Sequence, residues 1–367
     1  MYNWQQADWP NFTYDNRAVA GVSGAYKAVV TGLISEVGQL PDTDLSEYLL
    51  TVAVEEAVTS SSIEGENINR EELRSSILNN LNLGVQRPTR DRRATAIARL
   101  ITLNRQTFAE PLTETALKYW HQLLLSFDPH LNVLGDYRQG SQPMRIVSGP
   151  VYRQTVHFEA PPADRVSTEM AALISFCNQP TSNYQSAVAR AGVAHLWFES
   201  IHPFEDGNGR LGRALIEKLL SQQLGTFVPF SLSHSIEQHR SAYYAALQTS
   251  QHTLDITPWM TYFCEVLLHA VEYAQVLIGY SIRKYAYFQR FDAHLTPSAR
   301  KAISKMFAAG PEGFKGDMTA RKFASINRVS RATATRALQQ LTALGALTQH
   351  GAGRSTHYRL PEELPLP

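Results

Sequence analysis

The sequence is poor in cysteine and has no long hydrophobic run. Its 367 residues include only two cysteines, Cys177 and Cys264, which stand far apart and without metal-ligand spacing. They predict neither a disulfide framework nor a zinc site, and they fit a reducing compartment. The most apolar long stretch, FCEVLLHAVEYAQVLIGY, is interrupted by Glu265, His269 and Glu272. It is too polar to cross a membrane.

Two further signals are missing. The first residues, MYNWQQADWPNF, lack the basic-then-apolar order of a signal peptide, so we expect a cytoplasmic protein with no membrane partner. No G-x-x-x-x-G-K-[ST] motif is found, which excludes a P-loop as a nucleotide site. With 44% hydrophobic and 18% charged residues the chain can bury cores, and its length favours two or three domains.

Charge is unevenly distributed, although the net charge is only +1. Between Phe291 and Leu360 there are eleven basic and three acidic residues, a balance of +8, which leaves 23 basic and 30 acidic residues elsewhere, a balance of −7. A basic terminal region on an acidic body is typical of nucleic-acid contact.

The apolar spacing predicts a mainly α-helical protein. Helices are expected from about residue 11 to 105 and from 113 to 269, the second block interrupted by a β-hairpin around 144–157. The pattern from Leu45 to Val58 predicts a helix that ends near Gly65. Glu64 would then face the negative end of the helix dipole, which raises the question of what positive group it meets.

The chemistry is concentrated in HPFEDGNGRLGR, from His202 to Arg213. A helical pattern ends at Ile201, Pro203 excludes the α conformation at His202, and apolar residues at helical spacing resume after Arg210. His202 stands at the mouth of this loop and is suited to take a proton from a hydroxyl group at neutral pH.

A Gly-containing loop before a helix predicts an anion site, because free N–H groups and the helix dipole meet there. Gly207 and Gly209 allow close backbone approach. Arg210 and Arg213 are three residues apart, so both can lean toward one ligand. Asp206 is a hard oxygen ligand suited to Mg²⁺. Together these are the parts of a phosphate-transfer site.

The same stretch resembles the signature of the Fic family, H-x-F-x-[DE]-G-N-G-R-x-x-R, at every specified position. SSSIEG, Ser60 to Gly65, resembles the inhibitory motif of the class with an N-terminal inhibitory helix. The resemblance extends from about residue 11 to 269. It implies the Fic fold, a helical bundle with a β-hairpin flap.

The resemblance implies a Mg²⁺-dependent protein adenylyltransferase, which moves AMP from ATP to a Ser, Thr or Tyr hydroxyl group. His202 would be the general base, Asp206 the Mg²⁺ ligand and Phe204 a core anchor. The phosphates would be bound by Gly207, Asn208, Gly209, Arg210 and Arg213. A kinase-like branch of the family has Lys where this chain has Gly209, which favours AMP transfer over phosphate transfer.

In the resembling class the inhibitory Glu, here Glu64, pairs with the second signature arginine, Arg213, and Ser60 would lie near the same phosphates. Without the signature, Glu64 would be interpreted as a solvated surface residue. In some relatives the same Glu supports removal of AMP, so de-AMPylation and transfer of another nucleotide-type donor stay open as alternatives.

Three further residues are candidates for substrate contact. Val147 lies in the expected flap, near Arg145 to Gly149, which would align the target backbone as an added strand. Tyr243 and Tyr244 are candidates for the adenine side, with core packing as the equal alternative. His195, seven residues before His202, is expected to be a packed helix residue rather than a metal ligand.

Residues 318–360 resemble a winged helix-turn-helix. The first helix is expected over Thr319–Ile326, and Ser330 is a good N-cap for the second. The second helix would bury Ala334, Ala337, Leu338, Leu341 and Leu344 and expose Arg331, Thr335, Arg336 and Gln339, with Gly345 as its stop. Such a surface suits DNA, and the alternative is protein contact or dimerisation.

We therefore expect an N-terminal helical region with the inhibitory helix (1–112), a Fic core (113–269), a linker helix (270–290) and a winged helix (291–367). The expected partners are ATP, a target protein with a hydroxyl side chain, which includes the chain itself, and DNA; a homodimer is left open. The rival function is a DNA-binding regulator whose Fic site only senses nucleotide.

Overall fold

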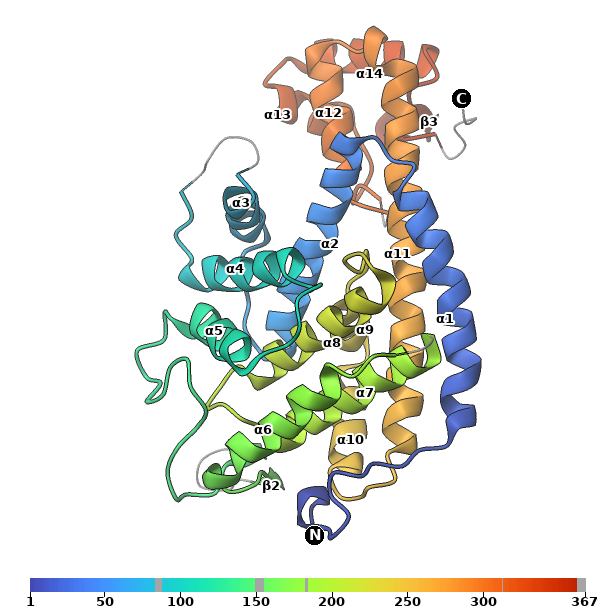
Figure 1. The fold of residues 1–367 in the computed structure, drawn as a ribbon. Coiled ribbons are helices and arrows are strands. Elements are labelled where there is room, and N and C mark those ends of the chain that lie inside the picture. Colours follow the sequence, from blue (N-terminus) through green and yellow to red (C-terminus); the bar gives the residue numbers. More distant parts are fainter. Residues whose placement is uncertain (83–87, 149–154, 182–183, 312, 362–367) are drawn as a thin grey trace. The chain divides into compact units, whose positions relative to one another are not determined.

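The computed structural model describes residues 1–82, 88–148, 155–181, 184–311 and 313–361, and it is mainly helical (Figure 1). The chain forms two compact units. The first contains residues 1–35 and 49–274, and the second contains residues 36–48 and 275–367. The prediction of a mainly α protein with a β-hairpin in its helical core is confirmed.

The first unit is built largely from helices and one hairpin. Their bounds are α1 Asn16–Val37, α2 Asp42–Ile63, α3 Arg70–Asn80, α4 Arg92–Gln106, α5 Glu114–Leu125, β1 Arg145–Ser148, β2 Thr155–Glu159, α6 Ala163–Cys177, α7 Tyr184–Ile201, α8 Asn208–Leu224, α9 Leu232–Gln238, α10 Arg240–Ser250 and α11 Thr257–Phe291. Helices α1, α2 and α11 contribute residues to both units.

Helix α7 forms the centre of the first unit. All its residues from Ala187 to Ile201 are buried, which is the pattern of a helix that is packed on every side. At Gly192 an added Cβ would lie 2.9 Å from a ring carbon of Phe263, and the indole of Trp259 donates a hydrogen bond of 2.8 Å to the Gly192 carbonyl. Only glycine allows α7 and α11 to approach this closely.

The hairpin lies where the sequence predicts it. Strands β1 and β2 pair antiparallel, with Arg145 opposite Glu159, and the register shifts between Ile146 and Val147. The Val147 side chain is 38% exposed. Gly149, the last residue of the expected flap, lies outside the described residues.

The second unit includes α12 Pro297–Phe307, α13 Ala320–Asn327, α14 Arg331–Ala343, β3 Thr348–His350 and β4 His357–Arg359. Thr319 and Ser330 cap α13 and α14 by accepting backbone N–H groups. This is the predicted order of helix, turn, helix and hairpin. Leu344 is 38% exposed rather than buried as predicted, because it is the C-cap residue, where the buried face of α14 has ended.

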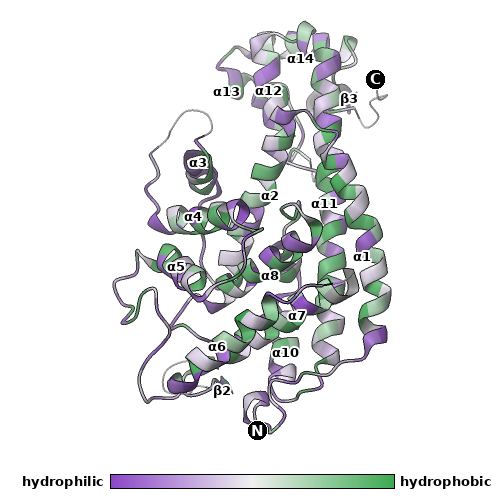
Figure 2. Cartoon of the chain, viewed as in Figure 1, coloured by the Kyte–Doolittle hydropathy of each residue, from purple (hydrophilic) through white to green (hydrophobic). Residues whose placement is uncertain are grey.

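Helix α11 runs without a break through residues 269 and 270, so the expected linker helix is the continuation of a core helix. Among the described helices, none is long and apolar enough to cross a membrane. Hydrophilic residues interrupt the hydrophobic ones along both α1 and α11 (Figure 2).

The N-cap of α14 gives a first prediction. Ser330→Ala removes the oxygen that accepts the Thr333 N–H at 3.1 Å, which should cost about 1 kcal/mol. Amide hydrogen exchange of α14 should become faster by about fivefold where it occurs through opening of this helix. Ser330→Asp, which keeps an accepting oxygen, should restore the slow exchange. Equal exchange in all three proteins would contradict a role for the cap.

Candidate active site

The loop between α7 and α8 is held by its own residues. The Asn208 side chain accepts the Phe204 N–H at 3.0 Å and donates to the Phe204 carbonyl at 2.9 Å, closing the turn. Phe204 is fully buried and stacks on the His121 ring with 4.3 Å between centroids. Phe204 is thus a core anchor, as expected. Because the amide of Asn208 is engaged in the loop, its own contribution to a phosphate would be its backbone N–H.

Gly207 has φ of +81° and is the N-cap of α8. An added Cβ there would lie 3.0 Å from a methyl carbon of Leu125, so both backbone conformation and space require glycine. The first N–H groups of α8, beginning with those of Asn208 and Gly209, have no preceding turn of helix to bond to. The start of α8, where Gly207 and Asn208 are buried and Gly209 is partly exposed, is therefore where the predicted anion cradle would lie.

His202 has an unusual backbone, with φ of +51°, outside the right-handed α region as the following Pro203 predicts. Arg138 fixes it, because its Nε donates to the His202 carbonyl at 2.8 Å and its Nη2 donates to the Ile201 carbonyl at 3.2 Å. The Pro203 carbonyl accepts the Arg138 backbone N–H at 2.9 Å. The imidazole is 17% exposed at its end of the loop.

Burial, with Arg138 acting in the same direction, lowers the pKa of His202 to about 4. The ring is therefore neutral at pH 7 and can accept a proton. The pKa falls this low although the Glu199 backbone and the carboxylates of Glu64 and Asp206 act in the opposite direction.

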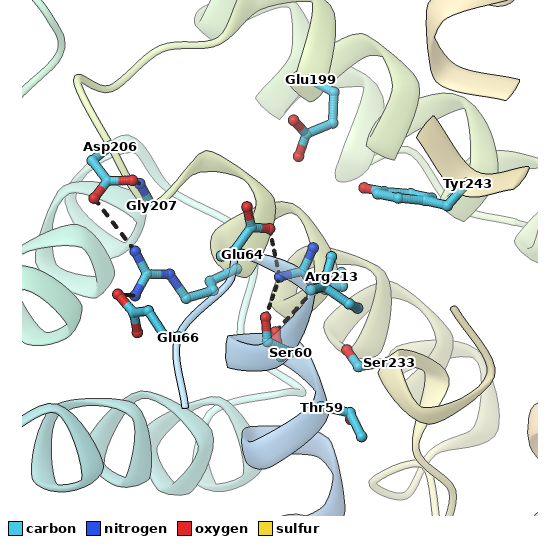
Figure 3. Close-up of polar contacts among 12 residues, drawn as sticks. Thr59, Ser60, Glu64, Glu66, Glu199, Asp206, Gly207, Arg213, Ser233 and Tyr243 are labelled. Carbon is cyan, nitrogen blue, oxygen red and sulfur yellow. Dashed lines mark hydrogen bonds and ion pairs between the residues drawn. The ribbon is translucent and has the colours of Figure 1, made fainter. Parts of the chain in front are cut away.

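Arg213 is almost completely buried and is held by α2. Glu64 Oε1 lies 2.9 Å from Arg213 Nη2, and Arg213 Nε donates to Ser60 Oγ at 2.9 Å (Figure 3). Arg213 Nη2 also donates to the Ser60 carbonyl at 2.8 Å. Burial lowers the pKa of Arg213, but Glu64 and Tyr243 more than offset this, so the guanidinium stays charged. The structure thus brings together the predicted pair of Glu64 and Arg213.

The end of α2 directs Glu64 toward the start of α8. Gly65 has φ of +80°. Its N–H donates to the Ser62 carbonyl and the Glu66 N–H donates to the Ser61 carbonyl, so α2 ends in a Schellman C-cap. A Cβ added to Gly209 would overlap Glu64 Oε1. The carboxylate therefore lies against the start of α8, where the positive end of that helix offsets the unfavourable end of α2.

The same turn supplies a second carboxylate, which sequence reasoning missed. Glu66 Oε1 lies 2.9 Å from Arg210 Nη1, and the Asp206 carboxylate lies 3.6 Å from Arg210 Nη2. The Arg210 side chain is only 2% exposed. A signal was available in the sequence, because Glu66 follows Glu64 with only Gly65 between them.

Asp206 fits the role of a metal ligand. Its side chain is 55% exposed, and Oδ1 accepts the Gly207 N–H at 2.6 Å, so the carboxylate stands open beside the cradle. Across the described ranges, no three His, Cys, Asp or Glu side chains form a cluster that could hold a metal. An Mg²⁺ ion held by Asp206 would take its other ligands from phosphate and water.

Further contacts hold α2 in place. The buried carboxylate of Glu56 accepts from Ser231 Oγ and from the Ser233 N–H, each at 2.9 Å. Ser62 Oγ donates to Glu237 at 2.7 Å. Helix α2 is therefore docked on α9 as well as on Arg213.

The two tyrosines occupy different environments. Tyr243 is buried and its hydroxyl lies 2.8 Å from His195 Nε2, so His195 is a packed helix residue, as expected. Tyr244 is 42% exposed and donates to the carbonyl of Ile63, the last residue of α2, at 3.1 Å. The adenine role of both tyrosines, and the role of Val147 in aligning a target, stay predictions.

Comparison with known proteins agrees with this geometry. Residues 111–220 match the Fic/DOC family, residues 2–83 match a domain of unknown function (DUF4172), and residues 315–361 match the C-terminal domain of DIP2311-like transcriptional regulators.

Two curated proteins are similar to part of the chain. The protein adenylyltransferase Fic of Culex quinquefasciatus is 28% identical over 160 residues, which are 41% of this chain and 31% of that protein. The protein adenylyltransferase fic-1 of Caenorhabditis briggsae is 29% identical over 114 residues, which are 31% of this chain and 21% of that protein. The chain thus spans less than a third of the length of these relatives.

A Fic family protein from Desulfovibrio desulfuricans G20, known from its crystal structure, has the same fold over nearly the whole chain. The TM-score is 0.58 at 21% identity, with 96% of this chain and 98% of that chain covered. The signature loop and these similarities agree, and residues 111–220 are a Fic domain.

Proposed function

We propose that the protein is an adenylyltransferase that moves AMP from ATP to a Ser, Thr or Tyr hydroxyl group of a protein. The observation that carries the proposal is a neutral His202 at the mouth of an anion cradle that contains two buried arginines. The names of the two curated relatives support the same reaction class.

In the proposed step, His202 takes the proton of the target hydroxyl group while its oxygen attacks the α-phosphorus of ATP. The bond from the α-phosphorus to the bridging oxygen breaks, and pyrophosphate leaves. Arg210, Arg213 and the N–H groups at the start of α8 bind the phosphate oxygens and orient the chain of phosphates. Mg²⁺, held through Asp206, would supply charge neutralisation between the phosphates.

We also propose that α2 inhibits the enzyme. With Glu64 on Arg213, that arginine cannot hold the γ-phosphate, and the carboxylate occupies the space beside Gly209. ATP then binds with its α-phosphate misplaced for attack. A displacement of about 1 Å can cost about 10²-fold in rate.

Transfer of α-labelled ATP onto protein, with Mg²⁺ and cell lysate as the source of targets, tests the reaction, the base and the inhibition together. Glu64→Gly should raise the label by about 10²-fold because Arg213 is released. Adding His202→Ala should lower it again by about 10²–10⁴-fold, the worth of a general base. Glu64→Gln separates loss of charge from loss of volume and should give an intermediate increase.

Label in none of these variants would remove adenylylation from ATP as the function. A pre-labelled protein that loses AMP only when Glu64 is present would indicate de-AMPylation instead.

Glu66 should add to the inhibition through Arg210. In the Glu64→Gly background, Glu66→Gln should tighten Mg²⁺–ATP binding by about 3–10-fold, because Arg210 loses its competing carboxylate. Isothermal titration calorimetry measures this without any turnover. Glu71→Gln, which removes an exposed carboxylate on α3, is the control and should not change the affinity. Equal affinities for all three proteins would show that the contact is incidental.

A second function, DNA binding, is favoured by the charge of +8 between Phe291 and Leu360. Arg331, Arg336 and Gln339 are exposed on α14, the helix placed to enter a major groove in this motif. The similarity to a transcriptional regulator's terminal domain supports the same proposal.

Fluorescence anisotropy with a duplex DNA library at several salt concentrations tests this binding. Arg331→Ala/Arg336→Ala should weaken it by about tenfold or more and reduce the salt slope by about 1–2. Lys301→Ala/Lys305→Ala removes the same charge from exposed positions of α12 and should have a smaller effect. Equal effects of the two pairs would indicate general charge attraction only.

A further inference from the structure

Glu199 is a buried carboxyl group that the mechanism above does not use. It lies on α7, its residue is 7% exposed, and Oε1 has no hydrogen-bond partner among the described residues. Figure 3 shows the side chain pointing from α7 toward the side of α8 that carries Arg213. A Cβ added to Gly212 would lie 2.6 Å from Oε1, so Gly212 provides the space that Glu199 fills.

The other carboxyl oxygen faces the proposed base. Glu199 Oε2 lies 3.9 Å from Nδ1 of His202, a buried nitrogen whose other nearby acceptor is the Glu199 main-chain carbonyl. A hydrogen bond requires about 2.7–3.2 Å, so a small rotation of the two side chains would complete it. Because Arg138 fixes the His202 backbone, the ring can turn toward Glu199 without moving the loop.

We propose that Glu199 is a positioning residue for His202: its carboxylate accepts the Nδ1 hydrogen and leaves Nε2 free to take the proton of the target hydroxyl group. The proton moves from the hydroxyl oxygen to Nε2, and the imidazolium that forms is stabilised by Glu199 until it releases the proton to solvent. This assignment rests on the proposed transfer function.

The inhibitory segment acts on the same carboxyl group. Burial, with the charge of Glu64 acting in the same direction and Arg213 opposing it, raises the pKa of Glu199 to about 8. Glu199 is therefore mostly protonated at pH 7 while Glu64 is in place. Removing Glu64 lowers this pKa, so release of the inhibitory helix also favours the ionised Glu199 that the base requires.

Other titratable or charged groups near Glu199 and His202 affect the pH dependence of this pair. The groups around Glu199 are Glu64, Arg213, Tyr243, His195 and His202. The groups around His202 are Arg138, Asp206, Glu64 and the Glu199 backbone. His195 stays neutral, since burial lowers its pKa to about 3, and burial raises the pKa of Tyr243 well above its usual value. Glu199, whose pKa is about 8 with Glu64 in place and lower without it, is thus the group of this cluster expected to titrate in the Glu64→Gly protein.

The Glu199 main-chain carbonyl also lies near the ring, and it offers a simpler explanation of how His202 is held. Glu199→Gln distinguishes positioning by the carboxylate from positioning by the main-chain carbonyl. It keeps the carbonyl, the volume and the neutral character that Glu199 has when protonated, but it cannot ionise. A merely structural Glu199 would therefore tolerate Gln without any change in pH dependence.

The experiment compares Glu64→Gly with Glu64→Gly/Glu199→Gln as full-length proteins. In the first, kcat for AMP transfer should rise through the Glu199 pKa as pH increases from 6 to 9. In the second, kcat should be flat over this range and about tenfold lower at pH 9, with KM for ATP unchanged. Glu217→Gln is the control, because Glu217 is equally buried with a raised pKa but faces Glu56, Arg105 and Asn104.

NMR of the histidine ring carbons provides a readout that does not need turnover, with His202 assigned by its loss in His202→Ala. The His202 signal should shift between pH 6 and 9 as Glu199 ionises, and this step should vanish in Glu199→Gln alone. If the His202 signal shows this pH-dependent shift but no variant transfers AMP, the contact between Glu199 and His202 is upheld and the transferase function is refuted. An unchanged pH profile and an unchanged His202 titration in Glu199→Gln would overturn the role of Glu199.

Discussion

The arrangement of the site depends on the pairing of one buried guanidinium group, that of Arg213. Arg213 is 1% exposed in its side chain, and a charge so deep in a protein must be paired. In this chain the partners come from α2, through the carboxylate of Glu64 and the hydroxyl and carbonyl of Ser60. The arginine that we propose to bind phosphate therefore gives α2 its docking point.

The position of Glu64 follows from two helix ends that meet. On α2 alone the carboxylate would face the negative end of a dipole, yet it lies against the start of α8, where an anion is favoured. Gly65 and Gly209 make the approach possible, the first by turning the chain and the second by lacking a side chain. In the proposed function, Glu64 would thus occupy the place of a phosphate group of the same sign of charge.

The sequence predicted the parts whose geometry is local. The order helix, loop, helix around His202, the cap at Ser330, and the hairpin of β1 and β2 depend on residues close together in the chain. Arg138 could not be predicted, because its contact with the His202 carbonyl spans 64 positions and depends on packing. Glu199 was missed for a related reason, since an acidic residue in a helix gives no sign in the sequence that it will be buried beside a histidine.

Glu64, the carboxylate that we propose to be inhibitory, directly follows Ile63, the last residue of α2, and this position has an energetic consequence. Helix ends open locally at a small fraction of the free energy needed to unfold the whole domain. Glu64 can therefore leave Arg213 when this one turn opens, which also breaks the contacts of Ser60 with Arg213 and of Ser62 with Glu237, while Glu56 keeps the rest of α2 on α9. In the proposed enzyme, such an arrangement would set a low but finite resting activity, and a partner that only traps the opened turn would be sufficient to raise it.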